Sequence, residues 1–245
     1  MLLQTRNLKK SFGRLAVLSD VSFEVRDGEL KSIIGPNGAG KTTLFNVITG
    51  RIPLDAGQIL FRGQDVAGAK PFVLSRMGMA RSFQINNFFP NLSTLDNIQL
   101  AIQSRLKTGT SSWRHFTRGD GALEKSLEVL DWIGLREHRD ELAINLSYGD
   151  QRKLEIGLAL GTDPSLLLLD EPTSGMSRYE SRSMIELIEG LSRRVTIILI
   201  EHDIELVMKV SHSILVIHYG QKIAEGTPEE IERNEEVQRV YLGGL

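Results

Sequence analysis

The chain has 245 residues, 41% of them hydrophobic and 24% charged, and its formal net charge is −2 at pH 7. This composition is typical of an ordinary globular protein that is long enough to bury a substantial core. The near-neutral charge gives no support to nucleic acid as the main partner.

Segments that enter or cross a membrane are not predicted. The longest apolar runs, 166–169 and 195–200, are far shorter than the roughly 20 residues that cross a bilayer. The N-terminus lacks the cationic and apolar regions of a secretory signal. The chain also contains no cysteine, which agrees with a reducing compartment. We therefore expect a cytosolic protein.

Short β-like runs separated by turns begin the chain, at 2–8, 15–18 and 21–25. Strict alternation of apolar residues in 21–25 predicts an antiparallel strand with one buried face. Phe12 lies outside this alternation and beside a glycine. Its ring is either a core or turn aromatic, or a platform on which an adenine base stacks.

A phosphate-binding loop of the form G-x-x-x-x-G-K-[ST] follows the apolar run 30–34 and precedes the helical stretch 44–50. Its glycines let backbone N–H groups converge on an anion, and the start of the next helix adds its positive dipole end. We expect Lys41 to reach the β- and γ-phosphates, and the hydroxyl of Thr42 to bind Mg²⁺. The residues expected to hold the nucleotide are Gly35, Pro36, Asn37, Gly38, Ala39, Gly40, Lys41, Thr42 and Thr43.

Two short strands are expected next, within 54–63 and 78–84, and the second ends in Gln84. A lone glutamine is most often a solvated surface residue, and its spacing alone gives no reason to assign it more.

A mostly helical block begins near residue 85. Ser93 and Asp96 match a capping box ahead of apolar positions at helical spacing. The polar, glycine-bearing stretch 107–121 looks like a loop or a loosely helical insert, and 122–135 returns to a helical stripe. The aromatic residues of this block either pack inside it or form a face for a partner.

Ser147 is placed as the N-cap of a largely buried helix. We expect free N–H groups of Tyr148 and Gly149 to point outward from the helix start, where a phosphate would bind. A plain helix cap would explain the serine equally well.

Acidic and histidine side chains follow two apolar runs of the kind that suits parallel strands buried on both faces. Asp170 and Glu171 end the first run, at the sheet edge where α/β proteins bind ligands. We expect Asp170 to hold the metal, and Glu171 to orient and deprotonate an attacking water. His202 follows the second run and is expected to contact the γ-phosphate. The alternatives are acids that are merely solvated and a structural histidine.

The C-terminal part is expected to complete the sheet with β-like runs at 214–218 and 222–225. Thr227, followed by proline and two glutamates, predicts a helix start. The segment 235–242 is expected to form a second short helix.

An ordered set of motifs in this chain resembles that of the nucleotide-binding subunit of an ATP-binding-cassette (ABC) transporter. These motifs are the loop 35–43, Gln84, the segment 146–151, the acids 170–171 and His202. Within that superfamily, the chain is similar to the ATPases of branched-chain amino acid and urea/amide importers. The segments that carry this similarity are 35–43, 171–176, 201–203, 224–228 and 241–243.

The resemblance implies an α/β fold of the P-loop NTPase class with a RecA-like core. The core and an antiparallel β subdomain would take up 1–84 and 161–225, a helical signature subdomain 85–160, and a helical tail 226–245. Phe12 would stack on adenine, Gln84 would act at the metal site and link it to a membrane partner, and His202 would be the switch histidine.

The resemblance also implies partners. ATP with Mg²⁺ would lie between the phosphate loop of one subunit and the signature of a second ATPase subunit, identical or a sister chain. The other partners would be integral membrane permease subunits at the cytoplasmic face and, indirectly, a solute-binding protein. The signature residues would be Ser147, Tyr148, Gly149 and Gln151.

Two positions depart from the common family pattern. Tyr148 stands where the signature usually has glycine, and Ser177 stands at the position of an aspartate. The first departure leaves the amide donors of the helix end in place, whereas the second makes communication between the two sites less certain.

Two other functions compete with transport. A soluble ABC ATPase of DNA repair or translation usually carries coiled coils, zinc sites or two cassettes, and none of these is evident here. A nucleotide-binding regulator without turnover would have no need of Glu171. The transported solute does not touch this subunit, so its identity cannot be read from these residues.

Overall fold

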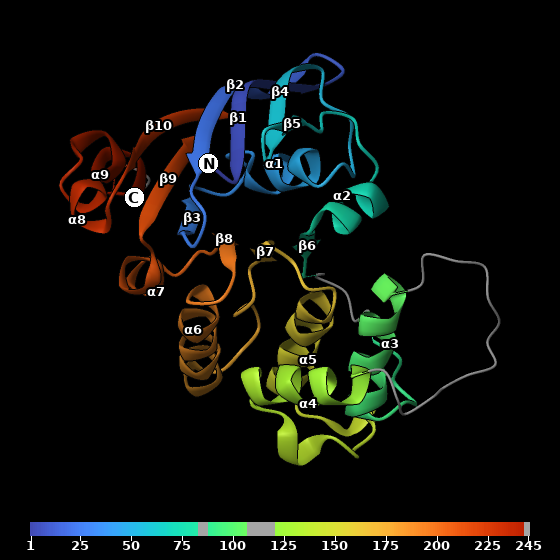
Figure 1. Ribbon diagram of the computed structural model, residues 1–245. Helices are drawn as coiled ribbons and strands as arrows, with labels where there is room; N and C mark the ends of the chain where they lie inside the picture. Colours follow the sequence, from blue (N-terminus) through green and yellow to red (C-terminus); the bar gives the residue numbers. More distant parts are fainter. Residues whose placement is uncertain (83–87, 107–120, 243–245) are drawn as a thin grey trace.

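Two β-sheets and a group of helices make up the computed structural model, which describes residues 1–82, 88–106 and 121–242 (Figure 1). The smaller sheet is antiparallel, with the order β2 (Leu15–Val25), β1 (Leu3–Phe12), β4 (Ala56–Phe61) and β5 (Gln64–Asp65). The larger sheet has the order β10 (Gln221–Gly226), β9 (Ser213–His218), β3 (Leu30–Ile34), β8 (Thr196–Ile200), β7 (Leu166–Asp170) and β6 (Met79–Arg81).

The larger sheet is parallel from β9 to β6, and only the edge strand β10 runs antiparallel. Its central strands β7 and β8 are buried at every residue, as their continuous apolar runs predict. On β7, Leu167 and Leu169 pack into the core that the helical block shares. Leu166 and Leu168 pack into a second core on the opposite face. The sheet is therefore covered on both sides.

The second core joins the two sheets through α1 (Lys41–Ile48), whose Leu44 and Phe45 are fully buried in it. In the small sheet, Val21, Phe23 and Val25 alternate toward this core, as predicted. The runs 15–18 and 21–25, predicted as separate strands, are one strand. A bulge leaves Asp20 unpaired at a positive φ of 70°, while Ser19 pairs with Lys9, so the strand continues through this position.

The helical subdomain consists mainly of α3 (Thr94–Leu106), α4 (Ala122–Trp132) and α5 (Tyr148–Gly161), which lie together away from the small sheet (Figure 1). The predicted cap of α3 is confirmed, since the Asp96 amide donates to Ser93 Oγ at 3.0 Å. Apolar side chains of all three helices form one core with the sheet. Gln84 and the insert 107–120 fall outside the described residues.

The helices outside α1 and the helical subdomain are α2 (Pro71–Met77), α6 (Arg178–Ser192), α7 (Ile204–Val210), α8 (Pro228–Glu232) and α9 (Glu235–Leu242). Short 3₁₀ turns lie at Arg136–His138 and Ala143–Asn145. Of these helices, α6 packs on the face of the large sheet that the helical subdomain also covers, whereas α8 and α9 contact the edge strand β10. The helix start predicted at Thr227 is confirmed, because Thr227 and Glu230 form a complete capping box. No helix within the described ranges is long and apolar enough to span a membrane.

Candidate functional site

The phosphate loop connects β3 to α1, as the sequence predicts, and its first and last glycines allow close packing. A Cβ on Gly35 would lie 2.1 Å from the carbonyl oxygen of Ile217 on β9. Gly40 has a φ of +103°, and a Cβ there would lie 2.8 Å from the carbonyl oxygen of Val17 on β2. Because both neighbours are backbone atoms, any larger residue would push the loop off the sheets.

Lys41, the first residue of α1, is buried inside the curve of this loop. Its Nζ donates to the carbonyl oxygens of Gly35 at 2.6 Å and Pro36 at 3.0 Å. Burial lowers the pKa of Lys41, although the charges of Glu171 and Asp170 act in the opposite direction. The charges of both acids at the end of β7 thus act on this buried cation.

Asp170 ends β7 with a fully buried side chain. Arg81 Nη2 donates to its Oδ2 at 2.7 Å, whereas Oδ1 is buried without a hydrogen-bond partner among the described residues. Burial raises the pKa of Asp170, and the charge of Arg81 opposes this shift. An unsatisfied carboxylate oxygen is the kind of ligand that Mg²⁺ takes. An unpartnered carboxylate oxygen on Asp170 and an exposed hydroxyl on Thr42 have the donor chemistry that such a cation takes.

Glu171 and His202 come from adjacent strand ends and meet at the site. Glu171 Oε1 and His202 Nε2 are 2.6 Å apart, and both side chains remain partly exposed. Glu171 has a positive φ of 48°, and its amide donates to the carbonyl oxygen of Ile200 on β8. Such strained backbone is found at functional sites when the surrounding structure enforces it. The histidine is therefore paired with Glu171 rather than held inside the core.

Two residues of the site had no role in the sequence-based prediction. Glu201 is buried and accepts hydrogen bonds from the amide and the Oγ1 of Thr173, at 3.0 and 2.6 Å, which fastens the loop after Glu171. Arg81 is a charged residue on a short buried strand. An acid at the end of an apolar run and a cation within a buried strand are the sequence signals that could have identified them.

The signature segment lies at the start of α5, where Ser147 is the N-cap, as predicted, and accepts from the Asp150 amide at 3.2 Å. Tyr148 is exposed, and its hydroxyl donates to the carbonyl oxygen of Ser174 at 3.1 Å. Gln151 Nε2 donates to the carbonyl oxygen of Leu146 at 3.1 Å.

An acid of α6 lies beside the predicted phosphate-binding end of α5. Glu180 Oε1 is 3.2 Å from the position that a Cβ on Gly149 would take. The hydroxyl and the amide of Ser177 hydrogen-bond Glu180 and hold its pKa below the ordinary value. The sequence-based prediction for this helix start did not include a neighbouring carboxylate.

Phe12 ends β1 with half of its surface exposed, so a core position is excluded. The ammonium group of Lys10 lies 5.5 Å from the centre of its ring. The described part of the chain therefore offers an exposed aromatic face at this end of the small sheet.

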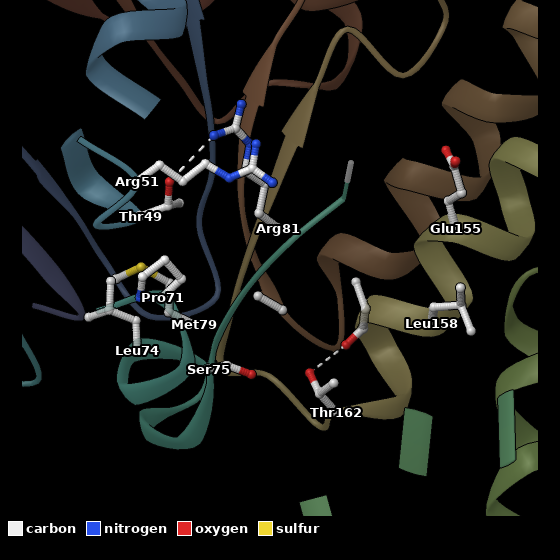
Figure 2. Close-up of a pocket in the computed structure, with 12 residues that line it drawn as sticks. Thr49, Arg51, Pro71, Leu74, Ser75, Met79, Arg81, Glu155, Leu158 and Thr162 are labelled. Carbon is white, nitrogen blue, oxygen red and sulfur yellow. Dashed lines mark hydrogen bonds between the residues drawn. The ribbon is translucent and has the colours of Figure 1, made fainter. Parts of the chain in front are cut away.

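A cavity of about 370 Å³ separates β6 and α2 from α5 (Figure 2). Figure 2 shows Arg81 extending from β6 toward Thr49, to which its Nη1 donates at 3.4 Å. The apolar lining consists of Pro71, Leu74, Met79, Ala80, Leu158 and Ala159.

The carboxyl edge of the parallel sheet carries a phosphate loop, two acids and a histidine, and the sheet is joined to a helical subdomain. Together these features define a nucleotide triphosphatase of the P-loop class. Comparisons with known proteins specify it further. Residues 18–174 match the ABC transporter family model, and residues 221–244 match that of the branched-chain amino acid ATP-binding cassette transporters. The chain therefore belongs to the ABC transporter family, as its ATPase cassette.

Relatives match along nearly the whole chain. It is 42% identical over 249 residues to the high-affinity branched-chain amino acid transport ATP-binding protein LivG of Salmonella typhimurium, covering 99% of this chain and 98% of the relative. It is 36% identical over 251 residues to BraF, the corresponding protein of Pseudomonas aeruginosa, covering 99% and 98%. A crystal structure of an ABC transporter cassette in its ADP conformation superposes with a TM-score of 0.86 at 30% identity, covering 99% and 98%.

Proposed function

We propose that this ATPase cassette hydrolyses ATP with Glu171 as the general base and His202 as the group that holds it and contacts the γ-phosphate. The observation that carries this proposal is the 2.6 Å contact between Glu171 Oε1 and His202 Nε2. A carboxylate at that position can accept the proton of an attacking water. Lys41 and the amides of 35–43 would bind the phosphates, and Phe12 would stack on the adenine.

Mg²⁺ would be held by the Thr42 hydroxyl, by Asp170 and by Gln84. The support within the described residues is the buried, unsatisfied Oδ1 of Asp170. When bound, the metal would neutralise charge on the phosphate oxygens. Arg81 meanwhile satisfies the other carboxylate oxygen.

We infer that a second ATPase subunit completes each site, with Ser147, Tyr148, Gly149 and Gln151 of one chain facing the phosphate loop of the other. The hydrogen bonds of Ser147 and Tyr148 go to Asp150 and Ser174, and both residues remain exposed. An exposed helix N-terminus can approach a phosphate of another subunit. The partner is an identical chain or a sister.

A substitution at Ser147 tests this arrangement. Ser147→Ala removes the capping oxygen, so ATP binding by a monomer should be unchanged while ATP-dependent dimerisation weakens. Sedimentation of the Glu171→Gln variant with and without Ser147→Ala measures the dimer. Equal loss of ATP binding and dimerisation would contradict a signature that acts across the interface.

Membrane permease subunits are proposed to dock beside Gln84 and residues 85–105, and to extend over the cavity between β6, α2 and α5. The exposed Phe72 on α2 and the apolar lining of the cavity offer a surface that a helix could cover. The complex would lie at the cytoplasmic face of the membrane, with a solute-binding protein as an indirect partner. ATP-driven closure and opening of the two cassettes would then move the permease helices.

The transported solute is proposed to be a branched-chain amino acid, or a related small polar solute such as urea or an amide. Support comes from the match of residues 221–244 and from the names of the similar proteins LivG and BraF. Co-purification with the native membrane subunits, followed by ATPase assays with each solute and its binding protein, tests this. Stimulation by leucine, isoleucine or valine is expected. A complex stimulated only by unrelated solutes would contradict the solute assignment, and a chain that binds no membrane subunit would contradict its coupling to transport.

A further inference from the structure

Arg81 is a buried cation that reaches three elements around the metal site. Its side chain is 7% exposed, and its Nη2 donates to Asp170 Oδ2 at 2.7 Å. Its Nη1 donates to Asn46 Oδ1 at 2.7 Å, and its guanidinium lies 5.5 Å from the centre of the Phe45 ring, both on α1. β6, β7 and α1 therefore meet at this single side chain.

The contact with Asp170 uses one nitrogen and one oxygen, although guanidinium and carboxylate groups can pair through two parallel hydrogen bonds. Oδ1 is left buried without a partner among the described residues. An unsatisfied buried acceptor is unfavourable unless a ligand completes it. The one-sided contact thus leaves the second carboxylate oxygen without a hydrogen-bond partner among the described residues.

The second anchor explains why the contact stays one-sided. Asn46 and, at 3.4 Å, Thr49 accept from Nη1, so this nitrogen faces α1 rather than Asp170. Phe45 packs beneath the guanidinium and restricts its rotation. A lysine at this position would have a single ammonium group and could not make both contacts with the same geometry.

We propose that Arg81 is a positioning residue, which holds the Asp170 carboxylate with Oδ2 anchored and Oδ1 free for Mg²⁺ of the ATP complex. The inference rests on the metal role proposed for Asp170. Arg81 touches neither nucleotide nor metal and acts through Asp170. A role limited to holding the fold together would lower stability without changing the response to the metal.

The test compares ATP affinity with and without metal, in a Glu171→Gln background that stops turnover. The ATP dissociation constant is measured by calorimetry in EDTA and in Mg²⁺, and the ratio of the two values reports the contribution of the metal. Arg81→Gln should reduce this ratio about 10-fold or more, as substitutions of residues that orient metal ligands do. The constant measured in EDTA should change less than about twofold, because Lys41 and the loop remain intact.

Arg76→Gln is the matched control, since Arg76 is an exposed arginine on α2 that stacks on Phe72. It should leave both constants unchanged. Arg81→Lys should recover only part of the ratio lost in Arg81→Gln. If Arg81→Gln does not fold, Asn46→Ala replaces it and should reduce the ratio by a smaller factor, because it removes the second anchor.

Three results would overturn the proposal. One is an unchanged ratio of the ATP dissociation constants in EDTA and in Mg²⁺ in Arg81→Gln. If Arg81→Gln does not fold, an unchanged ratio in both Asn46→Ala and Arg81→Lys has the same meaning. Another is a proportional loss of ATP affinity in EDTA and in Mg²⁺, which would indicate a structural role alone. The third is an equal effect of Arg76→Gln, which would show that any loss of an arginine in this region acts in the same way. A failure of the general-base assignment would instead appear as normal turnover in Glu171→Gln alone, so the two ideas fail separately.

Discussion

Replacing Glu171 by glutamine keeps the shape of the side chain and removes its ability to accept a proton. A positioned general base contributes about 10²- to 10⁴-fold to a rate, which equals about 3 to 5.5 kcal/mol of activation free energy. We therefore expect ATP turnover to fall by this factor. Binding should persist, since Lys41 and the amides of 35–43 are unchanged and the amide can still pair with His202.

Loss of stability cannot account for an effect of that size. Glu171 and His202 are 25% and 44% exposed in their side chains, so weakening their contact should change the free energy of unfolding by about 1 kcal/mol or less. Phosphate release and ATP binding are measured on the same preparation, with Glu205→Gln on α7 as an exposed control. Turnover within about fivefold of wild type, with binding intact, would refute the base assignment.

Three further predictions concern the loop, the backbone and pH. Lys41→Met should weaken ATP binding at least about tenfold by calorimetry, because a charge-assisted hydrogen bond contributes about 1.5 to 3 kcal/mol. Glu171→Gly should melt at a higher temperature than Glu171→Ala, since glycine adopts the positive φ found there without strain. Burial alone would raise the pKa of Glu225, but hydrogen bonds from Lys31 and Lys222 hold it below the ordinary 4.5. The wild type should therefore have a higher free energy of unfolding than Glu225→Gln above pH 4.5. This difference should disappear as the pH falls through the lower pKa that Glu225 has in the folded state. Three results would contradict these predictions: equal melting temperatures of Glu171→Gly and Glu171→Ala, a stability difference between wild type and Glu225→Gln that does not change with pH, and unchanged ATP affinity in Lys41→Met.

Features encoded by short segments were predicted well. The apolar runs before Asp170 and His202 became parallel strands buried on both faces, because only such an environment suits a run without polar residues. Ser93, Ser147 and Thr227 each cap a helix, since capping depends on residues two or three positions apart. The phosphate loop is likewise a local motif and lies where its strand and helix place it.

Features that depend on residues far apart in the sequence were not predicted. Arg81 and Asp170 are 89 positions apart, and no local pattern shows that β6 and β7 become neighbours in register. The closeness of the Glu180 carboxylate to Gly149 likewise requires α5 and α6 to pack together. Side chains with several possible partners, such as Phe12, were left with two interpretations because burial is decided by tertiary packing.

Asp170 and Glu171 are adjacent carboxylates in the sequence, but the fold gives them different environments and therefore different chemistry. Asp170 is the last residue of a fully buried strand and is anchored by a cation, so its remaining oxygen is fixed in a dry environment. The positive φ of Glu171 turns the chain immediately afterward, and its carboxylate reaches the partly exposed His202. A fixed oxygen suits a metal ligand, whereas a partly solvated carboxylate suits proton transfer. The backbone turn between the two residues therefore separates the proposed roles, and neither residue could replace the other.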